Sequence, residues 1–250
     1  MGARFRHVLD LQLRLIDTST GRAVTRGPIE LFRDGKPLEY SVRDESLLLI
    51  DSGREDFELR IRAFGYEEKC LSIRYAELDV KMPSVEPHLI PNGRDGRAVY
   101  TLEGEMPGLV AIDAVRMGDT PALMREFDER KKIMKVFNPH RLEMSNVFYG
   151  IVDPNEGTYE AIEIKKRISD SEYKLSRKLE KSFGNNSPVT RLAFGRVDEK
   201  GRYLLRVRDD TREPKWLVRC TADGKEAFYP VDFKRPETLV LRAGDTGVRG

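Results

Sequence analysis

The chain has 250 residues, of which 34% are charged and 39% hydrophobic, and its 44 basic and 42 acidic side chains nearly cancel. A net charge of +2, with both signs interspersed, gives no global reason to bind nucleic acid or an anionic membrane. The balance is typical of a folded chain with a highly charged surface and excludes the charge excess of a disordered one.

Targeting signals and cysteines suggest where such a chain would fold. Charges interrupt every apolar run near the start, so we expect no secretory signal, and no stretch approaches the roughly 18 apolar residues of a membrane span. The two cysteines are Cys70 and Cys220, which we expect to be reduced core thiols unless they meet in space. We therefore expect a cytoplasmic protein, or one released as part of a larger particle.

Residues 1–84 alternate in the manner of β-strands. One face of the segment 7–16 carries the leucines at positions 9, 11, 13 and 15, while polar residues lie on the other face. Further strands are predicted at 28–32, 38–42, 46–50, 56–64 and 70–75, separated by turn residues. This spacing predicts an N-terminal β-sandwich module over residues 1–84.

The middle of the chain, residues 85–145, is predicted to be a linker and a central connector. Three prolines and two glycines fall within 82–97, a composition typical of a linker or a long surface connection. Strands are expected at 98–104 and 109–115. In the segment 119–137, Asp119 or Thr120 could cap a helix with Pro121 at its first position, but 133–137 suits either a helix or a strand.

The last part of the chain is again rich in strand patterns. Strands predicted at 147–152, 158–168, 189–197, 202–208, 215–221, 226–233 and 238–241 define a C-terminal β-sandwich module over 146–241. A helix is expected within it at 171–183, because Leu175, Leu179 and Phe183 recur every four residues and Gly184 follows. The tail 242–250 should be flexible. The fold class is thus mainly β, with two antiparallel sandwich-like modules, an irregular central segment and one or two short helices.

The segment 195–209, GRVDEKGRYLLRVRD, could be a cation site or a turn between two strands. A calcium loop needs an oxygen ligand at its third position, where this segment has Lys200. We therefore predict a tight hairpin with Gly201 in the turn. Leu204 is the apolar exception on a strand face that also carries Arg206 and Arg208, which makes this face a candidate contact for a neighbouring subunit.

Turn motifs recur at the two ends of the chain. They are Asp17 with Gly21, the pair Gly65-Tyr66, and Asp198 with Gly201 and Tyr203. In these motifs the chain resembles the transthyretin-like, carboxypeptidase-regulatory-like family of small β-sandwiches, although 44–49 lacks that family's DxxGxY hairpin. The resemblance implies a sandwich used as a structural or recognition module, usually without catalysis.

Motifs that would indicate catalysis or a cofactor do not occur. His7, His88 and His140 stand apart from one another and from the cysteines, and no nucleophile elbow, P-loop or dinucleotide fingerprint is found. We expect no metal and no cofactor. Acidic pairs at 67–68, at 126 with 128 and at 209–210 leave a carboxylate hydrolase as a third hypothesis. The basic runs 130–132 and 165–167 are flanked by acids, which favours solvated faces over a nucleic-acid footprint.

The leading functional hypothesis is a non-enzymatic structural or adaptor component of a multiprotein assembly, by analogy of the phage-tail-like or contractile-particle kind. Its partners would be other protein subunits, without nucleic acid, membrane insertion or a small-molecule ligand. Candidate partner contacts are Met117, Met124, Phe127, Met134, Phe137, Leu204, Arg206 and Arg208. The alternative is a carbohydrate- or cell-surface-binding module in which Trp216 and Tyr149 would contact sugar.

Overall fold

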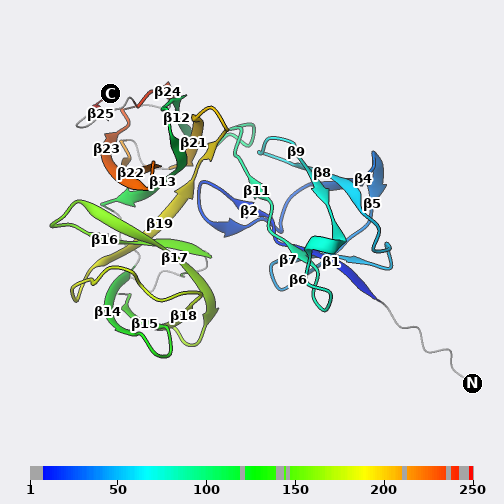
Figure 1. Ribbon diagram of the computed structural model, residues 1–250, viewed down its shortest axis with the longest axis horizontal. Coiled ribbons are helices and arrows are strands. Elements are labelled where there is room, and N and C mark those ends of the chain that lie inside the picture. Colours follow the sequence, from blue (N-terminus) through cyan, green and yellow to red (C-terminus); the bar gives the residue numbers. More distant parts are fainter. Residues whose placement is uncertain are drawn as a thin grey trace, which may run out of the picture. The chain divides into compact units, whose positions relative to one another are not determined.

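The computed structural model describes residues 8–118, 122–138, 144, 147–209, 213–234, 238–241 and 248–249. Strands make up 57% of the chain and helical turns 1%, so the prediction of a mainly β protein is confirmed. The chain forms two compact units (Figure 1). The N-terminal unit comprises Met1–Asp17 and Ala23–Gly96, and the C-terminal unit comprises Thr18–Arg22 and Arg97–Gly250.

The N-terminal unit contains two four-stranded sheets, with the strand orders β10-β1-β7-β6 and β5-β4-β8-β9 (Figure 1). A short third sheet has the order β11-β2-β3. The strands are β1 (Leu9–Leu13), β2 (Ile16–Asp17), β3 (Arg22–Ala23), β4 (Ile29–Arg33), β5 (Lys36–Leu38), β6 (Ser41–Arg43), β7 (Ser46–Ile50), β8 (Phe57–Ala63), β9 (Lys69–Ile73), β10 (Ser84–Val85) and β11 (His88–Leu89), with a 3₁₀ turn η1 (Tyr75–Glu77).

The core of this unit follows from the alternation of its strands. Leu11 and Leu13 of β1, like Leu59 and Ile61 of β8, are completely buried. The residues between them on β8 face the other way, so that β8 has a buried face and a charged outer face. Each fully buried leucine or isoleucine stabilises the fold by about 1.5–3 kcal/mol, which is why the period-two pattern was a reliable guide here.

The predicted linker at 82–97 is wrong. β10 and β11 lie parallel to β1 and β2, and Leu89 is 1% exposed. The carbonyl oxygens of Pro83 and Pro87 accept hydrogen bonds from Gln12 and Ile16. A proline cannot donate, but at the edge of a sheet its carbonyl can still pair, so a proline-rich segment became an edge strand.

Six strands of the C-terminal unit close into a barrel, because β14 pairs with both β15 and β19. The order around the barrel is β14-β15-β18-β17-β16-β19 and all neighbours are antiparallel. The strands are β14 (Ala122–Asp128), β15 (Ile133–Phe137), β16 (Phe148–Asp153), β17 (Thr158–Arg167), β18 (Glu172–Leu175) and β19 (Pro188–Phe194). Closure leaves these six strands without a long open edge.

A second core of the C-terminal unit lies beside the barrel and includes Trp216, Tyr203 and Phe233. Beyond β19 the large sheet continues as β13-β22-β23-β25, and a separate sheet has the order β20-β21-β12-β24. These strands are β12 (Val99–Glu105), β13 (Leu109–Met117), β20 (Arg196–Val197), β21 (Arg202–Arg208), β22 (Lys215–Ala222), β23 (Lys225–Asp232), β24 (Thr238–Leu239) and β25 (Val248–Arg249). Gly195 separates β19 from β20, where an added Cβ would lie 2.4 Å from Ile112 Cγ2.

The helix predicted at 171–183 is absent, and the segment 119–137, for which helix and strand were both left open, forms strands in its described part. Residues 122–137 form the hairpin β14–β15, whereas the proposed cap at 119–121 lies outside the described residues. The segment 171–183 begins with strand β18 and continues without regular structure. There the buried Glu160 carboxylate accepts hydrogen bonds from the backbone N–H groups of Glu180 and Lys181, which holds the chain in a non-helical path.

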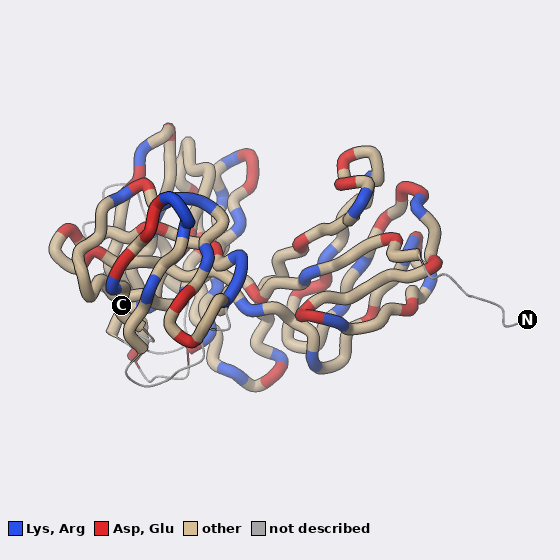
Figure 2. The backbone as a smooth tube through the Cα atoms, turned by 90° about the horizontal axis from the view of Figure 1, so that it is seen from below, with Lys and Arg blue, Asp and Glu red and all other residues tan. Residues whose placement is uncertain are grey.

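The unit boundaries also differ from the predicted modules. The expected central connector is divided, because 85–96 belongs to the N-terminal unit and the residues from Arg97 onward belong to the C-terminal unit. In the expected tail, β25 pairs with β23, and 242–247 lies outside the described residues. Lysine and arginine are interspersed with aspartate and glutamate along both units (Figure 2). Within the part of the chain that is described, no helix is long and apolar enough to cross a membrane.

Candidate binding site

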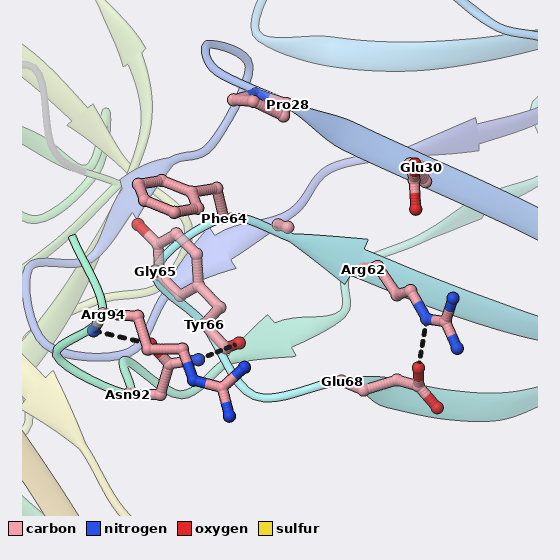
Figure 3. A pocket seen from close by; sticks show the side chains of 10 residues that line it. Pro28, Glu30, Arg62, Phe64, Gly65, Tyr66, Glu68, Asn92 and Arg94 are labelled. Carbon is pink, nitrogen blue, oxygen red and sulfur yellow. Dashed lines mark hydrogen bonds and ion pairs between the residues drawn. The ribbon is translucent and has the colours of Figure 1, made fainter.

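A pocket of about 370 Å³ lies in the N-terminal unit where β8 ends and the chain turns toward β9 (Figure 3). Glu30, Arg62 and Glu68 line it from the outer face of the sheet. The turn at 64–66 forms another wall, and Asn92 and Arg94 approach from the segment after β11. The pocket therefore collects side chains from three separate parts of the sequence.

The turn after β8 fixes the position of Phe64. The Phe64 N–H donates to the carbonyl oxygen of Pro28 at 3.1 Å, and the Tyr66 N–H donates to that of Ala63 at 3.1 Å. Gly65 has a φ of +86°, and an added Cβ would meet the Asp95 side chain at 3.1 Å, so both backbone and space require glycine. Phe64 is held on this turn with 62% of its surface exposed.

Asn92 clamps the same turn from the opposite side. Its side-chain N–H donates to the Tyr66 carbonyl at 2.5 Å, and its backbone N–H donates to the Gly65 carbonyl at 2.9 Å. Its side-chain oxygen accepts the Arg94 N–H at 3.0 Å. The Tyr66 hydroxyl donates to the carboxylate of Asp17, a residue only 4% exposed. These bonds order the pocket wall before any ligand arrives.

Charges on the outer sheet face are arranged in rows across the strands. Arg62 donates to Glu68 at 2.5 Å and pairs in register with Glu30 on β4. This hydrogen bond lowers the pKa of the Glu68 carboxyl below its usual value, so Glu68 is ionised at neutral pH. The guanidinium groups of Arg60 and Arg62 lie 4.7 and 5.2 Å from the centre of the Phe32 ring, a cation–π geometry.

The pocket lining can bind but offers little for acid–base chemistry. It presents one exposed phenyl ring, two guanidinium groups, two carboxylates and one amide. A general acid needs a raised pKa, and the pKa of Glu68 is lowered. Stacking, ion pairing and hydrogen bonding are the interactions that this arrangement supports.

A second pocket, of about 500 Å³, lies beside the hairpin of β20 and β21. The Asp198 carboxylate there accepts hydrogen bonds from the N–H groups of Lys200 and Arg202 and from the Arg202 side chain. Burial raises the pKa of Asp198, but these bonds outweigh it and the pKa lies below its usual value. Gly201 has a φ of +76°. The predicted tight hairpin is therefore confirmed, and its carboxylate is occupied in holding the turn.

Seven of the eight predicted partner contacts are buried or half-buried in the C-terminal unit. Met124, Met134, Leu204 and Arg208 are buried, and Met117, Phe127 and Arg206 are half-buried. The prediction that the first four form an exposed contact surface is wrong, because barrel closure turns the two methionines inward and Leu204 lies between Glu103 and Arg196 of neighbouring strands. Phe137 is 46% exposed, with the Arg125 guanidinium 4.8 Å from its ring centre.

The aromatic rings proposed for sugar binding are also buried. Trp216 is 1% exposed and Tyr149 is 2% exposed. Trp216 belongs to the second core and Tyr149 to the barrel core. Neither ring can offer a face to a ligand, so this assignment of the sugar site is wrong.

The acidic pairs singled out in the sequence are engaged in ion pairs. Asp209 accepts from Arg116 at 2.5 Å with both side chains buried, and Glu126 accepts from Lys135 at 2.9 Å. Asp128 accepts the Lys131 N–H, which lowers the pKa of its carboxyl. Asp210 lies outside the described residues. The carboxylates of Asp209, Glu126 and Asp128 thus each contribute to a local structure.

Histidine and cysteine show no clustering in the described chain. No group of three or more His, Cys, Asp or Glu side chains there could hold a metal ion. His88 lies 3.8 Å from Glu86, whereas His7 and His140 are outside the described residues. Both cysteines are free: Cys70 is exposed, contrary to the prediction, and Cys220 is buried. Burial raises the pKa of the Cys220 thiol to about 12, which keeps it protonated.

Phe64, Asn92 and Arg94 were not predicted as site residues. The Gly65-Tyr66 pair did mark the turn, but the exposure of Phe64 depends on where β8 ends. The role of Asn92 depends on a contact with residues 26 positions earlier. Comparison with known proteins adds nothing to this site: no family model matches the chain, and no curated protein matches it.

Proposed function

We propose that the protein is a non-enzymatic structural or adaptor component of a multiprotein assembly, and that it contacts a partner subunit through the pocket at the end of β8. The observation that carries the proposal is Phe64, whose ring is 62% exposed on a turn fixed by backbone and Asn92 hydrogen bonds. Burying such a ring against a partner is worth about 1.5–3 kcal/mol.

Arg94 supports the same proposal. It is exposed on the pocket rim, and its guanidinium makes no hydrogen bond or ion pair within the described residues. Arginine and aromatic residues are enriched in protein interfaces and among their energetic hot spots. Because the turn is already ordered, docking would cost little conformational entropy.

The test is the partner content of complexes isolated from the cells that make the protein. Phe64→Ala combined with Arg94→Ala should weaken capture of the partner roughly 30-fold or more, equivalent to about 2 kcal/mol or above. Ile168→Ala, which shortens an exposed apolar side chain of the C-terminal unit, is the control and should leave capture unchanged. Equal partner recovery with all variants would refute the role of the pocket.

A second candidate function, a carbohydrate- or cell-surface-binding module, is favoured by the same ring in a different way. Phe64 lines the same pocket as the carboxylates of Glu30 and Glu68 and the guanidinium of Arg94, and a sugar needs both a stacking face and groups for its hydroxyls. Glycan-array binding that is lost in Phe64→Ala and kept in Phe137→Ala would establish it. A blank array with the native protein would remove it.

The nature of the assembly belongs to the proposal as well. A phage-tail-like or contractile particle is put forward by analogy, and the resemblance to transthyretin-like modules remains a prediction. Assembly in the cytoplasm fits two free cysteines. We propose protein subunits as the partners, rather than nucleic acid, since charges of both signs are interspersed along both units (Figure 2).

A further inference from the structure

Strand β9 has an open edge. It pairs with β8 on one side (Figure 1), and no strand of the described chain pairs with its other side. Lys69, Cys70 and Ser72 are exposed. The other outer strands of the two large sheets of this unit are shorter, and β5 contains Pro37, a residue that blocks strand addition. β9 is therefore the edge of these sheets best able to accept another strand.

The hydrogen-bond pattern shows which backbone groups point outward from β9. Phe64 donates to Pro28 and Asp34 donates to Glu58, so even-numbered residues of this strand face β4. Odd-numbered residues consequently face β9, where Leu59 pairs with Leu71. Lys69, Leu71 and Ile73 then bond to β8, and the N–H and C=O groups of Cys70 and Ser72 point toward the open edge.

The open edge is complementary to a second copy of itself. An antiparallel pair with its two-fold axis at Leu71 places Cys70 opposite Ser72 of the other copy, and these are the residues whose backbone groups point outward. The half-buried Leu71 meets its own symmetry mate on the core side. Glu68 falls opposite Arg74, an exposed cation whose guanidinium has no partner in the described residues. Hydrogen bonds, apolar contact and charge agree on one register.

We propose that a second copy of this chain docks on β9 in this register and joins the two sheets across a two-fold axis. The inference rests on the proposed function, in which the chain is a component of a multiprotein assembly, and it adds that two copies of the chain meet there. Both copies use the same patch, so the contact closes on itself and does not propagate into fibres. Its small size makes the dimer weak alone and effective only where other contacts hold the copies close.

Cysteine cross-linking in the full chain tests the register. In a Cys70→Ser background, Leu71→Cys places two thiols on the axis at a Cα separation of about 4.5 Å, within disulfide range. Leu38→Cys in the same background is the matched control, since Leu38 is also a half-buried residue of an outer strand packed on the same core. Mild oxidation should give about tenfold more covalent dimer at position 71 than at position 38. Equal yields, or no dimer at position 71, would overturn the proposal.

A second variant tests the contact without a disulfide. Ser72→Pro removes an N–H that points to the open edge and leaves the bonds between β8 and β9 intact. Sedimentation at high protein concentration should show weak dimers of the native chain and only monomers of Ser72→Pro. Dimers of equal strength in both would refute the dimer. If the Ser72→Pro chain is still recovered in the native assembly while neither protein dimerises, the proposed function stands and the β9 contact fails. A lone chain in the lysate of its own cells instead defeats the proposed function.

Discussion

The buried carboxylate of Glu160 offers a sharp test of how the C-terminal unit is held together. It is 3% exposed and accepts the N–H groups of Glu180 and Lys181 at 3.0 and 2.9 Å. The Arg177 guanidinium donates to it at 2.9 Å. Glu160→Gln keeps the size of the side chain but removes its charge and turns an amide N–H₂ toward these donors. The substitution therefore weakens the bonds to these partly buried donors, and it leaves the Lys181 N–H without its acceptor if the amide nitrogen takes the place of Oε2.

The expected cost follows from these bonds. A hydrogen bond to a charged group contributes about 1.5–3 kcal/mol, and a buried donor left unsatisfied costs a similar amount. Because the Arg177 side chain is 45% exposed and can turn to water, its bond is discounted. We expect Glu160→Gln to lower the free energy of unfolding by about 3 kcal/mol.

Trp216 makes the measurement selective for this unit, because it is the single tryptophan of the chain and is buried in the C-terminal unit. Urea unfolding followed by its emission should show a midpoint about 1.5 M lower for Glu160→Gln, with a slope of roughly 2 kcal/mol per M. The exposed Glu199 supplies the control: Glu199→Gln should stay within about 0.5 kcal/mol of the native protein. A midpoint for Glu160→Gln as high as that of the control would refute the reasoning.

Three further outcomes are expected. In the same urea assay, Gly150→Ala should lower the free energy of unfolding by about 2 kcal/mol, because the new Cβ would lie 2.2 Å from Val115 Cγ1. Gly184→Ala should be neutral, because nothing lies within 4 Å of its Cβ position. Equal stabilities of the two variants would contradict the packing around Gly150. A thiol reagent at pH 8 should react with Cys70 alone in the native protein and with both cysteines in urea, because burial raises the pKa of Cys220 to about 12. Rapid reaction of both thiols in the native protein would contradict this. Asp209→Asn should destabilise by about 3 kcal/mol, since it removes the carboxylate charge from the buried ion pair with Arg116, and an unchanged midpoint would contradict this role of the pair.

Period-two alternation predicted the strands well where one face is buried and the other solvated. β8 alternates buried apolar residues with exposed or half-buried charged ones, and β21 carries Tyr203, Leu205 and Val207 toward a core as expected. Such strands can be predicted from the local sequence, because burial of one face requires apolar and polar residues to alternate.

The errors arose where distant contacts decide the local structure. Leu175, Leu179 and Phe183 have helical spacing, yet Glu160 binds the intervening backbone and prevents a helix. Met124 and Met134 resembled an exposed connector, but the pairing of β14 with β19 places them inside a barrel. Neither the Glu160 contact nor the pairing of β14 with β19 can be predicted from local sequence patterns, because each joins segments far apart in the chain.

The candidate site was partly visible in the sequence. The pair Gly65-Tyr66 marked a turn, and Gly65 takes a φ of +86° in it. The importance of Phe64 was hidden, because its exposure is set by the end of β8 and by the clamp from Asn92. Trp216 and Tyr149, which the alternative hypothesis assigned to sugar binding, lie in cores instead, as large aromatic residues do more often than they line surfaces.

The central claim, that this chain is a binding subunit of an assembly, is tested most directly by the native mass of the tagged protein isolated from the cells that make it. The account predicts a particle heavier than two chains, which dissociates when Phe64→Ala and Arg94→Ala are combined and persists in Ile168→Ala. A native mass equal to one chain, or to a dimer with no other protein bound, would contradict it.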